Sequence, residues 1–401
     1  MRPAAEQAGL GKVLVLALGT FATGTDAFII AGLVPAVAGA LHTSVAAAGQ
    51  MVTVFALVYA VGSPLITTAL ANLPRRAVLI GALLCFALVN VCSAASQNII
   101  MLGATRVLAA LCAGLFAPGA AASASGMVPP GRRGRALAIV LGGTSLSTVL
   151  GVPLGLYVAE LTSWRGAFLF VAALAVLAAI GIAALLPAVE PPPRIALGER
   201  LALLRRPDIL SILLVTVCAN AGGFSVYTYL APLFQGVGDA GTVRILIFVF
   251  GLAAVCGGYL AGHGSDTWGA TRVLTGSLVV FTINHFLLAY WADAFTTSVL
   301  YMVIWGVAGW GTVPPQQHRL VHAAGPAAGI AISLNASAIY LGIGLGGLLG
   351  GYVVQTAGAD HLWLSAGCGG ALALLLVPLS VAAERRTAAA RERTTEATAA
   401  S

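Results

Sequence analysis

A series of long apolar runs, separated by short polar breaks, extends through this 401-residue sequence from one end to the other. Hydrophobic residues make up 59% of the chain and charged residues only 8%, whereas about 25% of an ordinary soluble domain is charged. So few charges cannot solvate the surface of a water-soluble fold. Because one membrane-spanning helix needs about 20 apolar residues, a chain of this length has room for about twelve.

We therefore predict an all-α integral membrane fold of twelve transmembrane helices. The 49 glycines fit this class, because small residues let membrane helices approach one another closely. Breaks at Pro, Gly, Asn or charged residues place the spans at approximately 13–40, 46–70, 77–96, 99–127, 136–159, 165–186, 209–235, 243–262, 272–291, 295–316, 325–355 and 360–382.

The basic residues distinguish the two ends of the predicted bundle. Almost all of them fall on the side of the N-terminus, and the opposite side has only Arg165 and Arg244. By the positive-inside rule both termini are expected in the cytoplasm, which requires an even number of spans. We expect a multi-pass protein of the bacterial inner membrane that functions as a monomer. Its expected partners are the lipid bilayer and a small-molecule substrate.

The longest polar interruption divides the spans six and six. It runs from Pro187 to Asp208 and reads as a proline-rich extended linker followed by a short helix on the cytoplasmic surface. The predicted organisation is an N-terminal half (1–186), this linker (187–208), a C-terminal half (209–382) and a disordered cytoplasmic tail (383–401). Two related halves are a common plan among membrane transporters.

Three other classes of function lack support in the sequence. The net charge of +7 comes from short clusters between apolar runs, not from the basic stripe that binds nucleic acid. A metal or redox site lacks support because the six cysteines lie inside apolar runs and show no CxxC spacing. There is no HExxH motif, Gly-rich phosphate loop or group of carboxylates. We therefore expect no enzyme activity, no metal and no bound cofactor.

One acidic and one basic residue lie in the middle of predicted spans. Asp26 is the only acid in mid-span and Arg106 the only base. A charge at that depth costs at least about 2.5–3.5 kcal/mol, so such residues usually mark an ion path, a proton relay or a substrate counter-ion. A structural ion pair that only fixes helix packing is the alternative. His285, also in mid-span, could shuttle protons or be a neutral packing residue.

The depths of Asp26 and Arg106 agree. Asp26 precedes Pro35, near the outer end of the first span, and Arg106 follows the start of the fourth span, which enters from that side. At a rise of 1.5 Å per residue, both lie about 10–14 Å below the outer surface. They are expected to meet if the first and fourth helices are neighbours.

Small residues repeat every four positions in the fifth and eleventh spans. Such a face lets another helix cross closely. Static packing is one interpretation, and a sliding contact between the two halves is the other, since each half has one stripe. The stripes consist of Gly143, Ser147, Gly151 and Gly155, and of Gly342, Gly346 and Gly350.

An aromatic face with a few amides is predicted on the seventh span. Asn220, Phe224 and Tyr227 are spaced i, i+4 and i+7, so they share one side of a helix. Such a face suits amphipathic organic molecules, although ordinary packing would produce it too. The other candidate cavity residues are Phe28, Tyr301, Trp305 and Asn335.

Together these residues resemble the twelve-helix drug/proton antiporter family of the major facilitator superfamily, particularly its bacterial branch of sugar, purine-nucleoside and chloramphenicol exporters. The resemblance implies roles for Asp26 and Arg106 in proton coupling and for Pro153 in the conformational change. It rests on Thr25–Pro35 (TDAFIIAGLVP), Arg106 with Gly114, Gly151–Gly155 (GVPLG), Val226–Pro232 (VYTYLAP), Ile332–Asn335 (ISLN) and Gly342–Gly346 (GIGLG).

One loop departs from the family pattern. The segment from Ala71 to Arg76 keeps the basic pair and lacks the acid, whereas the corresponding loop of the second half keeps Asp266 and Arg272. The resemblance implies a charged latch between the halves at this loop. The missing acid puts that latch in doubt in the first half.

The expected function is proton-coupled efflux of a small amphipathic organic compound or drug by alternating access, with protons as the coupling ion. Because one scaffold hosts many substrates, the family does not identify the molecule. A metabolite exporter or uptake permease, for a sugar or a nucleoside, is a second interpretation. A non-transporting membrane receptor is a third.

Overall fold

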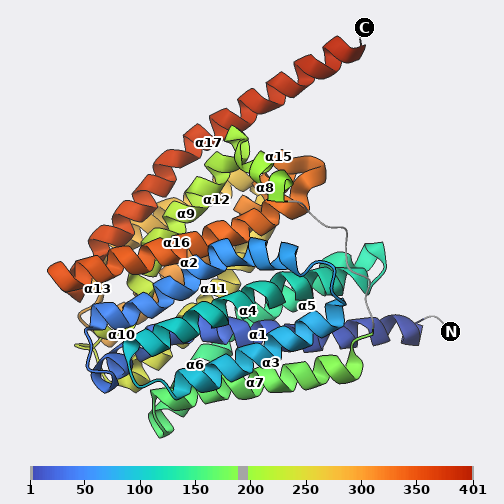
Figure 1. Ribbon diagram of the computed structural model, residues 1–401. Coiled ribbons are helices and arrows are strands. Elements are labelled where there is room, and N and C mark those ends of the chain that lie inside the picture. Colours follow the sequence, from blue (N-terminus) through green and yellow to red (C-terminus); the bar gives the residue numbers. More distant parts are fainter. Residues whose placement is uncertain (1–2, 188–196, 400–401) are drawn as a thin grey trace.

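The computed structural model describes residues 3–187 and 197–399, and all regular elements in these two ranges are helices (Figure 1). The N-terminal half begins with four long helices. Side chains cap two of them, because Ser44 and Asn98 accept hydrogen bonds from the amides of Ala47 and Met101. The half comprises α1 (Pro3–Ala40), α2 (Val45–Ala69), α3 (Arg75–Ala94), α4 (Ile99–Gly126), η1 (Pro130–Arg132), α5 (Arg133–Leu146), η2 (Ser147–Gly151), α6 (Val152–Leu161) and α7 (Trp164–Leu185).

The second half follows the same plan of long helices joined by short loops. It is preceded by α8 (Leu197–Leu204), the predicted short helix of the linker. The half comprises α9 (Pro207–Tyr227), α10 (Leu230–Leu233), α11 (Ala240–Trp268), α12 (Ala270–Phe286), α13 (Leu288–Trp291), α14 (Phe295–Trp310), α15 (Val313–Ala324), η3 (Gly325–Ala327), α16 (Ala328–Thr356), η4 (Ala359–His361) and α17 (Leu362–Ala399).

The described helices account for twelve spans, as predicted. Ten helical stretches are long and apolar enough to cross a membrane, and one of them, Phe295–Thr356, has 62 residues. That stretch contains both α14 and α16, which are joined by α15 and η3. The twelfth span is α12, which has 17 residues and leads almost directly into α13.

The fifth span is interrupted by a π-helical turn. Over Ser147–Gly151 the backbone widens, and the amide of Val152 bonds to the carbonyl of Ser147, five residues back. Pro153 follows directly and has no amide hydrogen to donate, so the regular ladder cannot continue through this point. The span therefore consists of α5, η2 and α6, and Pro153 marks the change in its hydrogen bonding.

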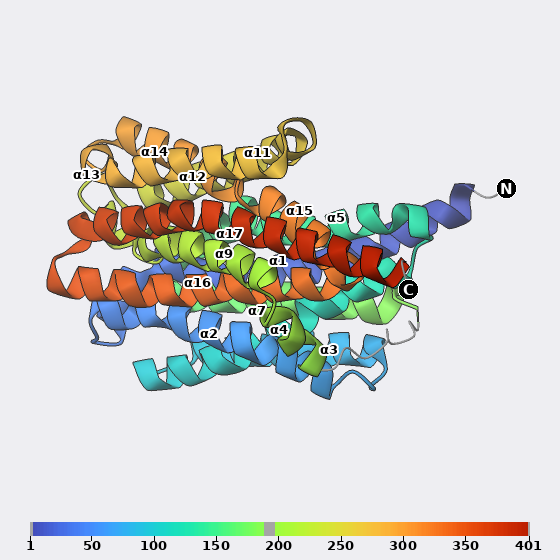
Figure 2. The same cartoon turned by 90° about the horizontal axis from the view of Figure 1, so that it is seen from above.

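Two lateral seams join the halves, and α1 also contacts α10. One seam is α2 against α16, which lie side by side in both views (Figure 2). The other is α11 against η2 and α6. Each pair joins one helix of the first half to one of the second, so these helices separate the interior of the bundle from its surroundings.

Two linker and tail predictions have different outcomes. The proline-rich part of the linker, 188–196, lies outside the described residues. The prediction of a disordered tail is wrong, because α17 continues as a helix through Ala399. Ala, Arg and Glu make up most of that segment, with neither Gly nor Pro after Pro378, and these are among the strongest helix formers.

Candidate functional site

Asp26 and Arg106 form an ion pair inside the N-terminal half, as their predicted depths required. Nη1 of Arg106 on α4 donates to both carboxylate oxygens of Asp26 on α1, at 2.9 and 3.0 Å. Both side chains have 0% exposure. Charges removed so completely from solvent depend on each other for compensation. The pair is therefore an electrostatic link between α1 and α4.

Polar and aromatic groups hold the other side of Arg106. Nη2 donates to Oγ of Ser93 at 2.5 Å, and Ser93 donates in turn to Oγ1 of Thr105 at 2.9 Å. The guanidinium carbon lies 4.7 Å from the ring centroid of Phe168 on α7, a cation–π contact. Ser93 and Phe168 were not predicted, because their positions in α3 and α7 carry no pattern that points to α4. Helices α1, α3, α4 and α7 thus all position this pair.

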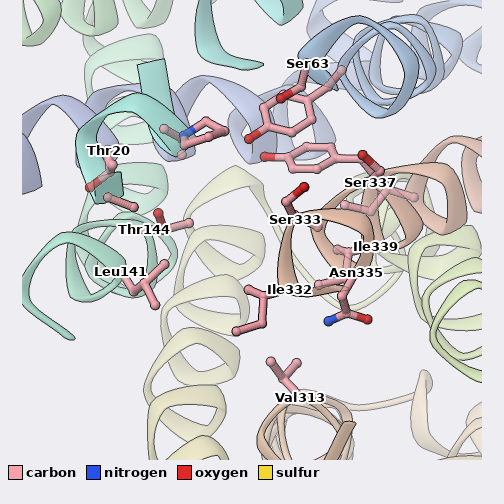
Figure 3. A pocket seen from close by; sticks show the side chains of 18 of the residues that line it. Thr20, Ser63, Leu141, Thr144, Val313, Ile332, Ser333, Asn335, Ser337 and Ile339 are labelled. Carbon is pink, nitrogen blue, oxygen red and sulfur yellow. The ribbon is translucent and has the colours of Figure 1, made fainter. Parts of the chain in front are cut away.

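A cavity of about 720 Å³ lies between the two halves. Figure 3 shows Thr20, Leu141 and Thr144 on one side of it, and Ile332, Ser333 and Ile339 on the other. It extends to the end of the bundle at which α2 joins α3 and α8 lies, because Ala71, Arg75 and Arg200 also line it. Its volume falls within the range of about 300–1,000 Å³ found for sites of small molecules.

Six of the seven predicted cavity residues line this space. The ring of Phe28 on α1 stacks on Phe224 of α9, with centroids 5.9 Å apart, and so joins the two halves across the cavity. Tyr227 lies 6.0 Å from Phe28 and 6.2 Å from Trp305, both edge to face. The amide residues Asn220 and Asn335 complete the set. The structure thus places the predicted aromatic face of α9 in the cavity wall.

Tyr301 is the exception, and its placement in the cavity was wrong. It is absent from the cavity wall and has 0% exposure. Its ring packs instead at 5.6 Å from Trp305 and 5.7 Å from His285. Tyr301 precedes Trp305 by one helical turn, so the same face of α14 continues from the cavity into the packed interior. His285 is itself buried, and its Nδ1 bonds to the carbonyl oxygen of Phe281.

A second aromatic contact between the halves was not predicted. Tyr59 of α2 and Tyr340 of α16 stack with their ring centroids 3.7 Å apart, and both line the cavity. Tyr340 precedes Gly344 by one helical turn, so the two residues share one face of α16. Without knowledge that α2 is the partner of α16, however, no signal connects Tyr340 to Tyr59.

The glycine stripes do not face the opposite half, contrary to the sliding-contact interpretation. A Cβ at Gly143, Gly151 or Gly155 would meet Ala17, Thr25 or Ile29, all on α1 of the same half. A Cβ at Gly342, Gly346 or Gly350 would meet Val217, Ala221 or Ser225, all on α9 of the same half. Each stripe therefore lets two helices of one half pack at close range. This arrangement is the one that the static-packing interpretation predicts.

Different glycines form the contact between the halves. A Cβ at Gly347 of α16 would overlap Oγ1 of Thr53 on α2, and one at Gly344 would lie 2.6 Å from Leu57. A Cβ at Gly251 of α11 would lie 2.7 Å from the carbonyl oxygen of Thr148 in η2. These three positions let the halves approach closely at both seams.

Polar contacts close the end of the bundle opposite α8. Nε2 of Gln50 on α2 donates to the hydroxyl of Tyr229 at 3.2 Å and to the carbonyl of Gly347 at 3.1 Å. Arg244 on α11 pairs with Glu160 on α6. Each of these contacts joins the two halves. The cavity is thus open toward one end and sealed at the other.

The predicted loop residues of the second half make no such contact. Asp266 at the end of α11 and Arg272 at the start of α12 are exposed. Neither side chain has a hydrogen bond or ion pair within residues 3–187 and 197–399. The same part of the chain contains no group of three His, Cys, Asp or Glu side chains that could hold a metal ion.

Comparisons with known proteins identify relatives over nearly the whole chain. The sequence profile of the Major Facilitator Superfamily matches residues 16–328 and 238–400. The chain is 32% identical over 378 residues to "Inner membrane transport protein YdhP" of Escherichia coli (strain K12), covering 94% of this chain and 97% of that protein. It is 31% identical over 364 residues to "Chloramphenicol resistance protein" of Streptomyces lividans (88% and 91%). With "Probable sugar efflux transporter" of Helicobacter acinonychis (strain Sheeba) the identity is 26% over 367 residues (91% and 94%).

Proposed function

Because this chain belongs to the Major Facilitator Superfamily, we propose that it exports a small amphipathic organic compound from the bacterial cytoplasm in exchange for protons. The observation that carries the proposal is the buried Asp26–Arg106 pair beside the central cavity. Asp26 lies on α1 between Thr23 and Phe28, and both of these line the cavity. A change in the charge of Asp26 is therefore well placed to act on the helix that contacts the substrate.

The proposed coupling uses two ways to neutralise one carboxylate. In this structure Arg106 compensates the charge of Asp26. If α1 and α4 shift so that the pair opens, a proton becomes the remaining means of neutralising Asp26 in a medium of low polarity. Re-forming the pair releases that proton. A cycle that opens the pair toward the outside and closes it toward the inside would carry one proton inward.

The sidedness of the cavity follows from the arginine distribution. The end at which α8 lies carries most of the basic residues, so we assign it to the cytoplasm, together with both termini. In this assignment the cavity is open to the cytoplasm, and the contacts of Gln50 and Glu160 close the outer end. Alternating access would break those contacts while the cytoplasmic mouth closes.

Names of relatives support export more than uptake. One is a chloramphenicol resistance protein and another a probable sugar efflux transporter. The cavity has rings for an apolar body and hydroxyl or amide groups for a few hydrogen bonds. The sugar relative and these polar groups favour metabolite export as the second candidate function.

Transport by the purified full chain in lipid vesicles tests the proposal. A panel that includes chloramphenicol and simple sugars is loaded, and a pH gradient is then imposed. We expect at least one compound to accumulate against its concentration gradient and protons to move in the opposite direction. Binding without any coupled flux would contradict the proposal and favour a receptor.

A further inference from the structure

The charged residues in the cavity wall are all of one sign. Among the described residues that line the cavity, only Arg75 and Arg200 carry a charge, and no carboxylate lines it. Asp26 lies behind the cavity wall, where Arg106 donates hydrogen bonds to both of its carboxylate oxygens. From the described residues, any substrate in this cavity therefore meets two cations and no anion.

Neither guanidinium has a counter-ion in the described part of the chain. The side chain of Arg75, the first residue of α3, makes no hydrogen bond or ion pair there, and the only such partner of the Arg200 side chain is Oγ of Ser333, at 3.1 Å from Nη1. Both side chains are half-buried, and the Nε atom of each is buried without a hydrogen-bond partner. Partial burial also lowers the pKa of the Arg200 guanidinium below its ordinary value. Half-buried cations without anions are unfavourable unless a ligand supplies the anion.

Neighbouring arginines differ from these two. Arg76, next to Arg75, donates to the carbonyl of Ala183 and does not line the cavity. Arg206 pairs with Asp208 and donates to the carbonyl of Ala323. Orientation of the protein in the membrane would require only that arginines lie in these loops. It does not account for two guanidiniums that line the cavity without a counter-ion among the described residues.

The cations and the rings occupy different parts of the cavity. Arg75 and Arg200 come from the end of the bundle where α3 begins and α8 lies. Phe28 and Trp305 come from interior turns of α1 and α14, and Phe224 comes from the last turn of α9, the end away from α8. A ligand that satisfies both parts has an apolar or aromatic body and an acidic group at one end.

We infer that the substrates are amphipathic organic anions, whose carboxylate, sulfonate or phosphate group binds Arg75 and Arg200 while the apolar body contacts the rings. This inference rests on the proposed function and specifies its substrate class. Guanidinium groups match the oxygens of such acids with paired, charge-assisted hydrogen bonds. A positive mouth with walls of low polarity also concentrates anions from the solution it faces. In the proposed orientation that solution is the cytoplasm.

A matched series of probes tests the sign of the preferred charge. Binding of 2-naphthoate, 2-naphthamide and 2-naphthylmethylammonium is measured by calorimetry on the purified full chain in phosphatidylcholine nanodiscs, without a pH gradient. We expect 2-naphthoate to bind at least about tenfold more tightly than the amide, and the cation most weakly. Equal affinities, or a preference for the amide or the cation, would overturn the inference.

Variants of the two arginines test whether these residues cause the preference for the anionic probe. Arg75→Gln and Arg200→Gln should each weaken 2-naphthoate binding by about tenfold and leave 2-naphthamide binding unchanged. Arg75→Lys should keep the preference for the anion, and Arg76→Gln is the matched control that should bind like the parent. If Arg75→Gln does not fold, Arg200→Gln on the separate helix α8 gives the same test. An unchanged anion preference in Arg200→Gln would overturn the inference.

Two further measurements distinguish a bound lipid from a substrate, and the substrate class from the transport activity. An anionic lipid headgroup offers the same chemistry, so the titrations are repeated in nanodiscs that contain phosphatidylglycerol. Abolition of 2-naphthoate binding there would assign the arginines to lipid and overturn the inference.

Uphill export of another panel compound without any anion preference would overturn this inference alone. Anion preference without uphill export of 2-naphthoate or of any other compound would overturn the proposed function instead.

Discussion

The carboxylate of Asp26 and the guanidinium of Arg106, 80 positions apart in the sequence, are 2.9 Å apart in the structure and have no exposed surface. The pair does not line the cavity but lies directly behind its wall, since Thr23 and Phe28 of the same helix as Asp26 line the cavity. An interaction placed there can respond to the substrate through α1 without contacting it. The proposed proton coupling depends on this arrangement.

The stability of the ion pair can be measured separately from transport. Arg106→Ala leaves the carboxylate of Asp26 buried without compensation, which should lower the free energy of unfolding by about 3–5 kcal/mol. The double variant Asp26→Asn with Arg106→Gln removes both charges and should be clearly more stable than Arg106→Ala. Thermal unfolding of the purified proteins measures both. If the single and double variants unfold at the same temperature, the pair is not compensating charge in the way described.

Two aromatic residues one helical turn apart should differ in substrate binding. Trp305 lines the cavity, so Trp305→Ala should weaken binding of the best compound of the panel by about 1.5–3 kcal/mol, roughly ten- to a hundredfold. Tyr301 lies outside the wall and its hydroxyl has no partner among the described residues. Tyr301→Phe should therefore bind like the parent. A loss of affinity in Tyr301→Phe as large as that in Trp305→Ala would show that Tyr301 also contacts the substrate.

Gly347 is expected to control the closed end of the bundle. A Cβ at this position would overlap Oγ1 of Thr53, so Gly347→Val should force α16 away from α2 and favour the state open at that end. Gly142→Val is the control, because nothing lies within 4 Å of its Cβ position.

Spin labels at Gln97 and Asp360, which are exposed loop positions on opposite halves, report this change. Pulsed distance measurements should show a larger population of long distances in Gly347→Val than in the parent or in Gly142→Val. Identical distributions in all three proteins would contradict the proposed role of Gly347.

Cysteine labelling tests the orientation in the membrane. Single cysteines replace Gln97, Asp360 and Asp266, all exposed, in a background without the six native cysteines. A membrane-impermeant reagent added to intact cells should label the first two sites and not the third, because the arginine-rich end faces the cytoplasm. Labelling at Asp266 alone would reverse the assignment.

The sequence carried enough information to predict the spans and the central pair. Apolar length determines where helices cross the membrane, and the depth of Asp26 and Arg106 follows from counting residues along two helices. The aromatic face of α9 was also predictable, because a spacing of three and four residues places Phe224 and Tyr227 on the same side whichever helix lies opposite.

The partner of each helical face was not predictable in the same way. The stripe of Gly151 shows that a helix packs closely there, but only the assembled bundle shows that Thr25 of the same half is its neighbour. The same applies to Gly347 with Thr53 and to Tyr59 with Tyr340. These contacts depend on the rotation of each helix about its axis, which many residues across the bundle determine together.

Uphill transport by Asp26→Asn tests the central claim most directly. The amide resembles the protonated carboxyl in shape and cannot exchange a proton, so substrate binding should persist between pH 5 and 9 without pH dependence, while export against a concentration gradient is lost. Both quantities are measured on the same purified variant, in nanodiscs and in vesicles with an imposed pH gradient. If Asp26→Asn still concentrates substrate with the pH profile of the parent, Asp26 is structural and the proton is carried elsewhere.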